Sequence, residues 1–377
     1  MTSDYGRSPG RTPSNRRGLA RSIARASALS LLLACGTNEE HRAVTGPVLD
    51  TVSTVALAEP DSVPITRSAA TLHALDGSWF LSDNGSDRIV HFSAAGAFLG
   101  TLGRHGQGPG EFDTPVGLFP LGPDTLGVVD LTLRRITLFT GLRADTVIGL
   151  PSEPYSVVVD GDRGWIGGVN VADRTTVVRW DRRSGAFTPL VPAPTAYAEG
   201  SPLAGIHSSA KMVAWSDSVL VAVSGYAWVR VASSDGAPLD SFTVPARLRR
   251  GTPLDLPERL SKLRDFPAMF AAASHLVAAT DVGGGWLAFL YMDLDYDMQH
   301  GTQNPHSYLT LVNRAERRAC VDIAVPASGD VTPQQDLRGD TLFVLDRRIS
   351  EAGALATTIT SYRIRPEQCP AEAVMRP

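Results

Sequence analysis

Residues 103–118, GRHGQGPGEFDTPVGL, decide how the rest of the chain is interpreted. They contain five glycines and two prolines. Glycine permits positive φ, and proline fixes φ and lacks an N–H, so this composition excludes a helix or a regular strand. Apolar, β-type stretches stand on both sides of it. We therefore predict a tight connector between two strands.

The stretches before and after this connector repeat each other. Both fit the pattern D-x4-R-I-x2-F, once over residues 83–92 and once over residues 130–139, with the two aspartates 47 residues apart. Four weaker copies follow, each with short apolar runs separated by Gly, Asn, Asp or Ser turns. A fixed period of this size indicates stacked supersecondary units.

Six copies predict an all-β fold, a six-bladed β-propeller of four-stranded antiparallel blades spanning residues 48–377. The last copy ends after its third strand, so we expect the N-terminal stretch, residues 48–57, to supply the fourth strand and close the ring. Residues 253–273 break the rhythm with leucines at helical spacing. They predict a short helical insertion between blades four and five, either packed on the rim or acting as a lid.

The motif from residue 103 to residue 117, preceded by Asp83-x4-Arg88-Ile89, resembles the repeat of NHL-type propellers, and the chain resembles six-bladed propeller lipoproteins of bacteria. The motif is clear in the first two blades and degenerate in the others. The resemblance implies the fold but hardly any function, because propellers host unrelated activities.

The connector has a structural and a functional interpretation. As a joint between blades one and two, it would use Phe112 to fill the wedge between the sheets and Pro115 to fix the approach to the next strand. As a phosphate loop it lacks a following Gly-Lys-Ser/Thr and a helix N-terminus, and Pro109 removes a donor. The recurring charges of the repeat, at Asp83, Arg88, Asp130 and Arg135, are likewise expected to satisfy turn amides and neighbouring blades.

The N-terminal segment is expected to be a signal and not part of the fold. Arginines precede a short apolar run, residues 26–34, that is well below the roughly 20 residues needed to span a bilayer. The run ends in Leu-Leu-Ala-Cys-Gly, which resembles the lipobox of bacterial lipoproteins. Residues 1–35 would then be a signal peptide, Cys35 the lipidated residue and residues 36–47 a polar tether. The alternative is a plain secretory signal; Gly36 resembles an outer-membrane sorting signal.

Charge and cysteine content fit an extracytoplasmic protein. The formal net charge is −4, and residues 1–35 hold six Arg and one Asp, which leaves 29 basic and 38 acidic residues, or −9, for the remainder. This balance argues against a nucleic-acid partner. Cys320 and Cys369 form an even pair, so a disulfide is expected; two separate buried thiols are the alternative.

One dense polar cluster is a candidate metal site. Asp293, Asp295 and Asp297 alternate in an extended chain and would lie on one side, with His300 close by. Three carboxylates suit calcium, although the spacing fails as an EF-hand because Met298 replaces the required Gly. The alternative is a solvated acidic hairpin.

Two function classes remain. The first is a membrane-anchored binding or scaffold module that presents an end face of the propeller to a protein, peptide or small-molecule partner. The second is a funnel-site enzyme of the metal-dependent lactonase or lyase type found in other six-bladed propellers. Catalytic residues stay unknown, since no nucleophile elbow or zinc-binding helix motif appears, and no cofactor is predicted apart from the calcium considered above.

Overall fold

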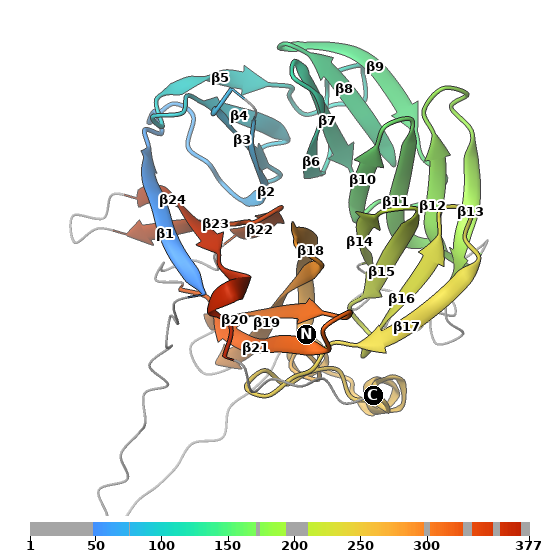
Figure 1. The fold of residues 1–377 in the computed structure, drawn as a ribbon. Helices are drawn as coiled ribbons and strands as arrows, with labels where there is room; N and C mark the ends of the chain where they lie inside the picture. The colour runs from blue at the N-terminus through green and yellow to red at the C-terminus, as the bar shows by residue number, and fades with distance from the viewer. Residues whose placement is uncertain are drawn as a thin grey trace, which may run out of the picture. The chain divides into compact units, whose positions relative to one another are not determined.

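The computed structural model describes residues 48–74, 76–170, 174–193, 210–297, 302–326, 334–349 and 355–370. These residues form six four-stranded antiparallel sheets arranged in a ring (Figure 1). The predicted six-bladed β-propeller is thereby confirmed. The first strand of each four-stranded unit lies nearest the centre of the ring.

Five blades are built from four consecutive strands that pair in chain order. In chain order, one blade contains β2 (Ser68–His73), β3 (Trp79–Asp83), β4 (Arg88–Phe92) and β5 (Phe98–Leu102). The next contains β6 (Pro115–Gly122), β7 (Thr125–Asp130), β8 (Arg135–Thr140) and β9 (Arg143–Gly149). It is followed by the blade of β10 (Ser156–Asp160), β11 (Arg163–Asn170), β12 (Thr175–Asp181) and β13 (Phe187–Pro192). Then comes the blade of β14 (Ala210–Trp215), β15 (Ser218–Val223), β16 (Trp228–Ser233) and β17 (Pro238–Thr243). The last of the five contains β18 (His275–Gly283), β19 (Trp286–Asp297), β20 (Thr302–Asn313) and β21 (Arg318–Ala324).

The remaining blade, which we call the closing blade, joins the two ends of the propeller. It contains β22 (Gln334–Arg338), β23 (Thr341–Ile349), β24 (Leu355–Ile364) and β1 (Leu49–Leu57). Strand β1 pairs antiparallel with β24, from Leu49 opposite Ile364 to Leu57 opposite Thr357. A short 3-10 helix, η2 (Pro366–Gln368), follows β24.

Local sequence explains why the blades repeat. In the β3–β4 turn Asp87 has a φ of 51°, and in the equivalent β7–β8 turn Arg134 has a φ of 48°. Each precedes the arginine of the D-x4-R-I motif, so the motif encodes the same tight turn twice. Every residue of β3 is buried, whereas the outer strand β17 is mostly exposed. The buried clusters each combine residues of adjacent blades, so the core lies between neighbouring blades.

The helical segment lies between the blades β14–β17 and β18–β21 and contains α2 (Leu256–Lys262) and α3 (Phe266–Phe270). Leu256 and Leu260 are fully buried in the cluster that contains Met212 and Val221. The helical spacing of these leucines therefore places both side chains on the buried face of the segment. When the closing blade, which holds the first strand, is counted as blade one, the helices lie between blades five and six. The predicted position between blades four and five was wrong, because that count began after β1.

Candidate functional site: the axial channel

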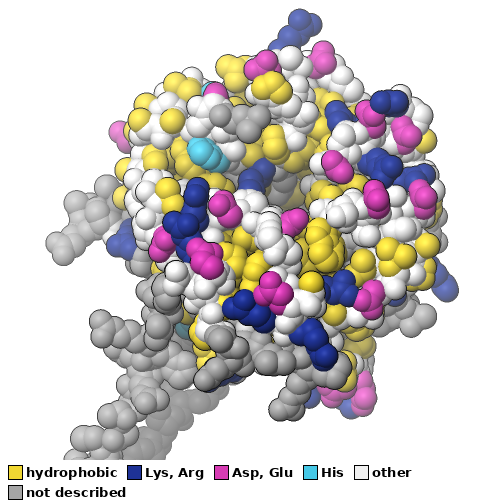
Figure 2. Space-filling model, viewed as in Figure 1, with side chains coloured by type: hydrophobic (Ala, Val, Ile, Leu, Met, Phe, Trp, Pro, Cys, Tyr) yellow, Lys and Arg dark blue, Asp and Glu magenta, His cyan; other side chains and the backbone are white. Residues whose placement is uncertain are grey.

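The inner strands of all six blades enclose a cavity of about 540 Å³ on the propeller axis. We call this cavity the axial channel. Its walls come from β2, β6, β10, β14, β18 and β22. Figure 2 shows one face of the ring, where hydrophobic, basic and acidic side chains all lie around the centre and over the blades.

The channel wall mixes apolar with polar and charged side chains, and the apolar part is somewhat the larger. Representative apolar residues are Val116, Leu118, Val157 and Val277. A concave site of several hundred Å³ with an apolar wall and a small number of placed polar groups is typical of small-molecule binding sites.

Lys211 is the most distinctive of the polar groups. It lies in β14 between Ala210 and Met212, which are both buried in the core, so the alternation of the strand turns Lys211 to the other face. Burial lowers the pKa of Lys211 below its ordinary value, and the charge of Asp336 opposes this effect. Within the described parts of the chain the amine of Lys211 has no hydrogen bond or ion pair.

The other charged groups of the channel are already engaged. Arg338 donates from Nε to Asp336 Oδ2 at 2.9 Å and from Nη2 to the main-chain oxygen of Leu118 at 3.1 Å. Asp281 accepts a hydrogen bond from the main-chain N–H of Gly283 at 2.8 Å. Lys211 is therefore the cation that remains available to a ligand.

Two neutral side chains of the channel also carry unused hydrogen-bonding capacity. Both amide atoms of Gln335 are buried without a partner in the described residues, and so is Oγ1 of Thr71. A buried polar atom without a partner costs free energy. These three atoms have almost no accessible surface, so a ligand in the channel would reach them only after their side chains turn toward it.

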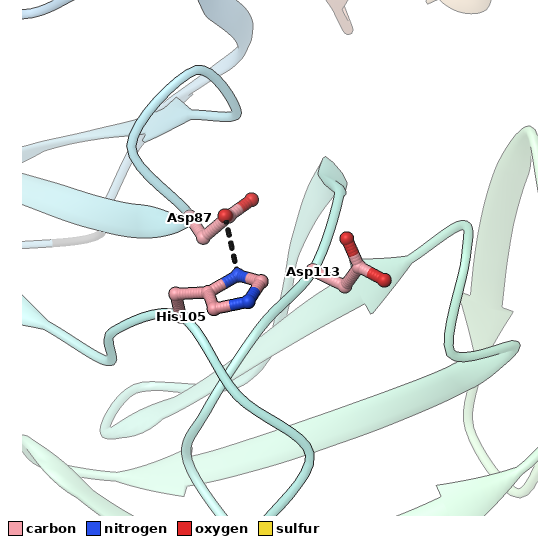
Figure 3. A group of neighbouring side chains, drawn as sticks. All are labelled: Asp87, His105 and Asp113. Carbon is pink, nitrogen blue, oxygen red and sulfur yellow. Dashed lines mark hydrogen bonds and ion pairs between the residues drawn. The ribbon is translucent and has the colours of Figure 1, made fainter.

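A second polar cluster lies outside the channel, at the joint between the blades β2–β5 and β6–β9. Nδ1 of His105 lies 2.9 Å from Oδ2 of Asp87, and Asp113 lies beside the imidazole ring of His105 (Figure 3). The three ligand atoms lie within 4.8 Å of one another. The side chain of His105 is 76% exposed, so the cluster lies at the surface. The His105–Asp87 contact suffices to explain the cluster as a bridge across the connector.

The predicted calcium residues are placed as follows. The side chain of Asp293 is buried and accepts hydrogen bonds from Ser274 Oγ at 2.6 Å and from the main-chain N–H of Arg250 at 2.9 Å. Asp295 pairs with the Arg250 side chain and lies 3.7 Å from Nε2 of His306. These contacts attach the segment before α2 to β19.

The other two residues of the predicted calcium site are Asp297 and His300. The side chain of Asp297 and all of His300 lie outside the described residues. The structure thus brings Asp293 and Asp295 together around Arg250. The complete set of predicted calcium ligands stays a prediction.

The repeat charges act within the blades. Asp83 is fully buried and accepts from the main-chain N–H groups of Thr66 and Arg67 at 3.1 and 2.9 Å, while Arg88 donates to its other oxygen at 3.2 and 3.1 Å. These bonds connect the entry of the blade to its β3–β4 turn.

The second copy differs in the partner of its arginine. Asp130 accepts from the main-chain N–H groups of Asp113 and Leu133 at 2.8 and 2.9 Å. Arg135 donates to the main-chain oxygens of Gln107 and Gly108 at 2.7 and 2.9 Å, and so holds the glycine-rich connector itself.

Phe112 and Pro115 lie at the joint between the blades β2–β5 and β6–β9. Phe112 is 0% exposed and packs in one cluster with Ile89, Val128 and Phe139. Pro115 begins β6, opposite Asp130. The connector is therefore held by packing and by main-chain hydrogen bonds.

Cys320 of β21 and Cys369, which directly follows η2, form a disulfide with Cα atoms 5.6 Å apart. This bond attaches the C-terminal end of the closing blade to the neighbouring blade β18–β21. Cys35 and the predicted signal and tether segments, residues 1–47, lie outside the described residues. Within the described ranges, no helix is both long and apolar enough to cross a bilayer.

Sequence reasoning missed Lys211, although one signal was present. The chain contains 33 arginines but only two lysines, Lys211 and Lys262. Lys262 is a surface residue of α2 that pairs with Glu258 at 2.7 Å. The rarity of lysine in this arginine-rich chain was the signal that could have drawn attention to Lys211.

Comparisons with known proteins give the fold. By sequence, the chain matches no family model and no curated protein. A protein from Bacteroides fragilis designated as exported superposes with a TM-score of 0.58 at 12% identity, covering 84% of this chain and 96% of that chain. A member of the DUF4221 family from Bacteroides vulgatus gives 0.56 at 9% identity, covering 84% and 98%. Streptogramin B lyase gives 0.47 at 12%, covering 84% and 89%, a similarity too low to bear on function. The first two superpositions support the fold. At such low sequence identity they carry no information about function, which has to be argued from the site.

Proposed function

We propose that this protein is an extracytoplasmic, lipid-anchored binding module that receives a small organic molecule in its axial channel. The ligand has a largely apolar body, to match the channel wall, and a carboxylate or carbonyl group that meets the amine of Lys211. The observation that carries the proposal is that amine, which lines the channel and has no protein partner among the described residues.

Physical chemistry supports an acceptor group at Lys211. Burying an unpaired ammonium group is unfavourable, and the lowered pKa of Lys211 reports that cost. A carboxylate in the channel would stabilise the charged form, so binding of an anion would be coupled to proton uptake. A neutral, purely apolar ligand would leave the cost unrelieved.

The location rests on the N-terminal sequence. Residues 1–35 have the form of a signal peptide that ends at Cys35, and the protein of Bacteroides fragilis with the same fold is designated as exported. Anchoring through Cys35, with the outer membrane as the favoured destination, would hold the propeller at a membrane surface on the tether of residues 36–47.

We favour this proposal over an axial metal enzyme. Among the described residues, the one group of three ligand side chains close enough for an ion is Asp87, His105 and Asp113. None of these residues lines the channel. The channel polar groups instead suit hydrogen bonding and ion pairing with an organic ligand.

Calorimetric titration with benzoate tests the binding proposal, because benzoate combines an apolar ring with a carboxylate. We expect binding to the wild-type protein and to Lys262→Met, and binding at least roughly tenfold weaker to Lys211→Met, since a charge-assisted contact is lost. Benzylamine, of similar shape but opposite charge, should not bind. Equal benzoate affinity in wild type and Lys211→Met would contradict the proposal.

Anchoring is tested separately. Growth with an alkyne-labelled fatty acid should label the wild-type protein in the membrane fraction, and Cys35→Ser should remove both the label and the membrane association. Label retained in Cys35→Ser would show that Cys35 is not the anchor.

A further inference from the structure

We infer that the channel takes a carbonyl compound, and that Lys211 binds an aldehyde or ketone group covalently as an imine. The inference rests on the proposed function and narrows its ligand class. It starts from the position of the amine, which lies inside a cavity of about 540 Å³ that is large enough for an organic molecule.

Accessibility is the first requirement for this chemistry. Lys211 is partly buried but lines the channel, so the channel gives a small molecule a route to its amine. No carboxylate within the described residues pairs directly with this amine. Asp336, whose charge acts on Lys211, is itself paired with Arg338 at 2.9 Å. The Asp336–Arg338 pair leaves the amine lone pair accessible once the proton has left.

The choice of lysine is the second argument. Arginine supplies 33 of the 35 basic side chains, yet the channel position carries lysine. A guanidinium group would serve an anion at least as well, because it offers a planar set of donors and stays charged. It cannot form an imine under ordinary conditions, whereas a desolvated lysine is a typical imine-forming nucleophile.

The reaction balances without an oxidant or reductant. The lone pair of neutral Nζ attacks the carbonyl carbon, a C–N bond forms, and the carbonyl electron pair moves to oxygen. Both protons of the amine pass to that oxygen, which leaves as water, and a C=N bond remains. The apolar side chains of the channel, such as Val116 and Val277, limit water around the product and so disfavour its hydrolysis. Burial of Lys211 increases the neutral fraction of the amine near neutral pH.

Reductive trapping tests the inference, and the rarity of lysine makes the result easy to interpret. The purified protein is incubated with benzaldehyde and sodium cyanoborohydride at about pH 7, where an ordinary lysine is almost fully protonated. Peptide mass spectrometry then compares benzylation of Lys211 with that of Lys262, the exposed lysine of α2. We expect Lys211 to be labelled roughly tenfold faster or more.

Variants and a competitor separate the possible outcomes. Lys211→Arg keeps the charge and should lose the label, with its fold checked by circular dichroism, whereas Lys262→Arg should retain labelling at Lys211. Benzoate should protect Lys211 alone. Labelling of Lys262 that is as fast as that of Lys211, or no label at Lys211, overturns the imine inference. If benzoate still binds by calorimetry in that case, the proposed function stands, and if benzoate also fails to bind, both fail.

Discussion

Arg338 of β22 donates a hydrogen bond from Nη2 to the main-chain oxygen of Leu118 in β6, at 3.1 Å, although the blade β2–β5 lies between their two blades. The same side chain holds Asp336 at 2.9 Å. Arg338 therefore reaches past a neighbouring blade along the channel and keeps the carboxylate of Asp336 partly neutralised beside Lys211.

Replacing Arg338 should change the titration of Lys211. In Arg338→Met the charge of Asp336 is no longer shared with a guanidinium group, so it acts more fully on Lys211 and raises the pKa of its amine. The pH at which Lys211 becomes reactive toward benzaldehyde should move upward. Arg338→Lys, which retains a cation, is the matched control and should shift it less; an unchanged profile in Arg338→Met would show that the pair does not control Lys211.

Replacing Lys211 should stabilise the protein. Its folded-state pKa is lowered by burial, so between that pKa and the ordinary value of 10.5 the unfolded state binds more protons, and wild-type stability rises with pH. Lys211→Met removes this cost and should unfold at higher urea concentration than wild type near neutral pH. The difference in unfolding midpoint between Lys211→Met and the wild type should become smaller as the pH approaches 10.5. Lys262→Met, at an exposed ion pair, should have little effect. A destabilised Lys211→Met would contradict the assignment.

Phe112 should be a major contributor to stability. Its side chain is fully buried at the joint between the blades β2–β5 and β6–β9. Phe112→Ala should lower the free energy of unfolding by about 3–5 kcal/mol, since a large cavity forms where the ring packed. Phe112→Leu should cost clearly less. Denaturant unfolding followed by tryptophan fluorescence measures both, and a loss near zero for Phe112→Ala would mean that the joint is not tightly packed.

The disulfide should stabilise the closing blade. Cys320 and Cys369 are 49 residues apart in sequence, so the bond restricts a long loop in the unfolded chain. The double variant Cys320→Ser/Cys369→Ser should lose about 2–4 kcal/mol of unfolding free energy. Measurement of the wild type with and without reductant gives an independent check. Equal stability of the oxidised and reduced wild type would contradict the prediction.

The sequence predicts the fold because each blade is specified locally. Asp83 and Asp130 with their arginines, and the glycine-rich connector between them, encode the turns and joints at a fixed period. The blade count around the helices was misassigned because β1, first in the chain, belongs to the last blade in space.

The site could not be predicted in the same way. Lys211 and Asp336 are 125 residues apart in sequence, and only ring closure brings their strands to one axis. No local sequence motif indicates that these two strands lie near each other. Asp293 and Asp295, by contrast, form a conspicuous local cluster, and the described contacts of their carboxylates are with Arg250, Ser274 and His306.

The most direct test of the central claim, that Lys211 presents a desolvated amine to the axial channel, is its titration by NMR. Reductive methylation with ¹³C-formaldehyde labels the two lysines and any free N-terminal amine, and Lys211→Arg and Lys262→Arg assign the lysine resonances. We predict that the Lys211 resonance titrates at clearly lower pH than that of Lys262, and that benzoate moves its midpoint upward. Coincident titration of the two lysines, unaffected by benzoate, would contradict it.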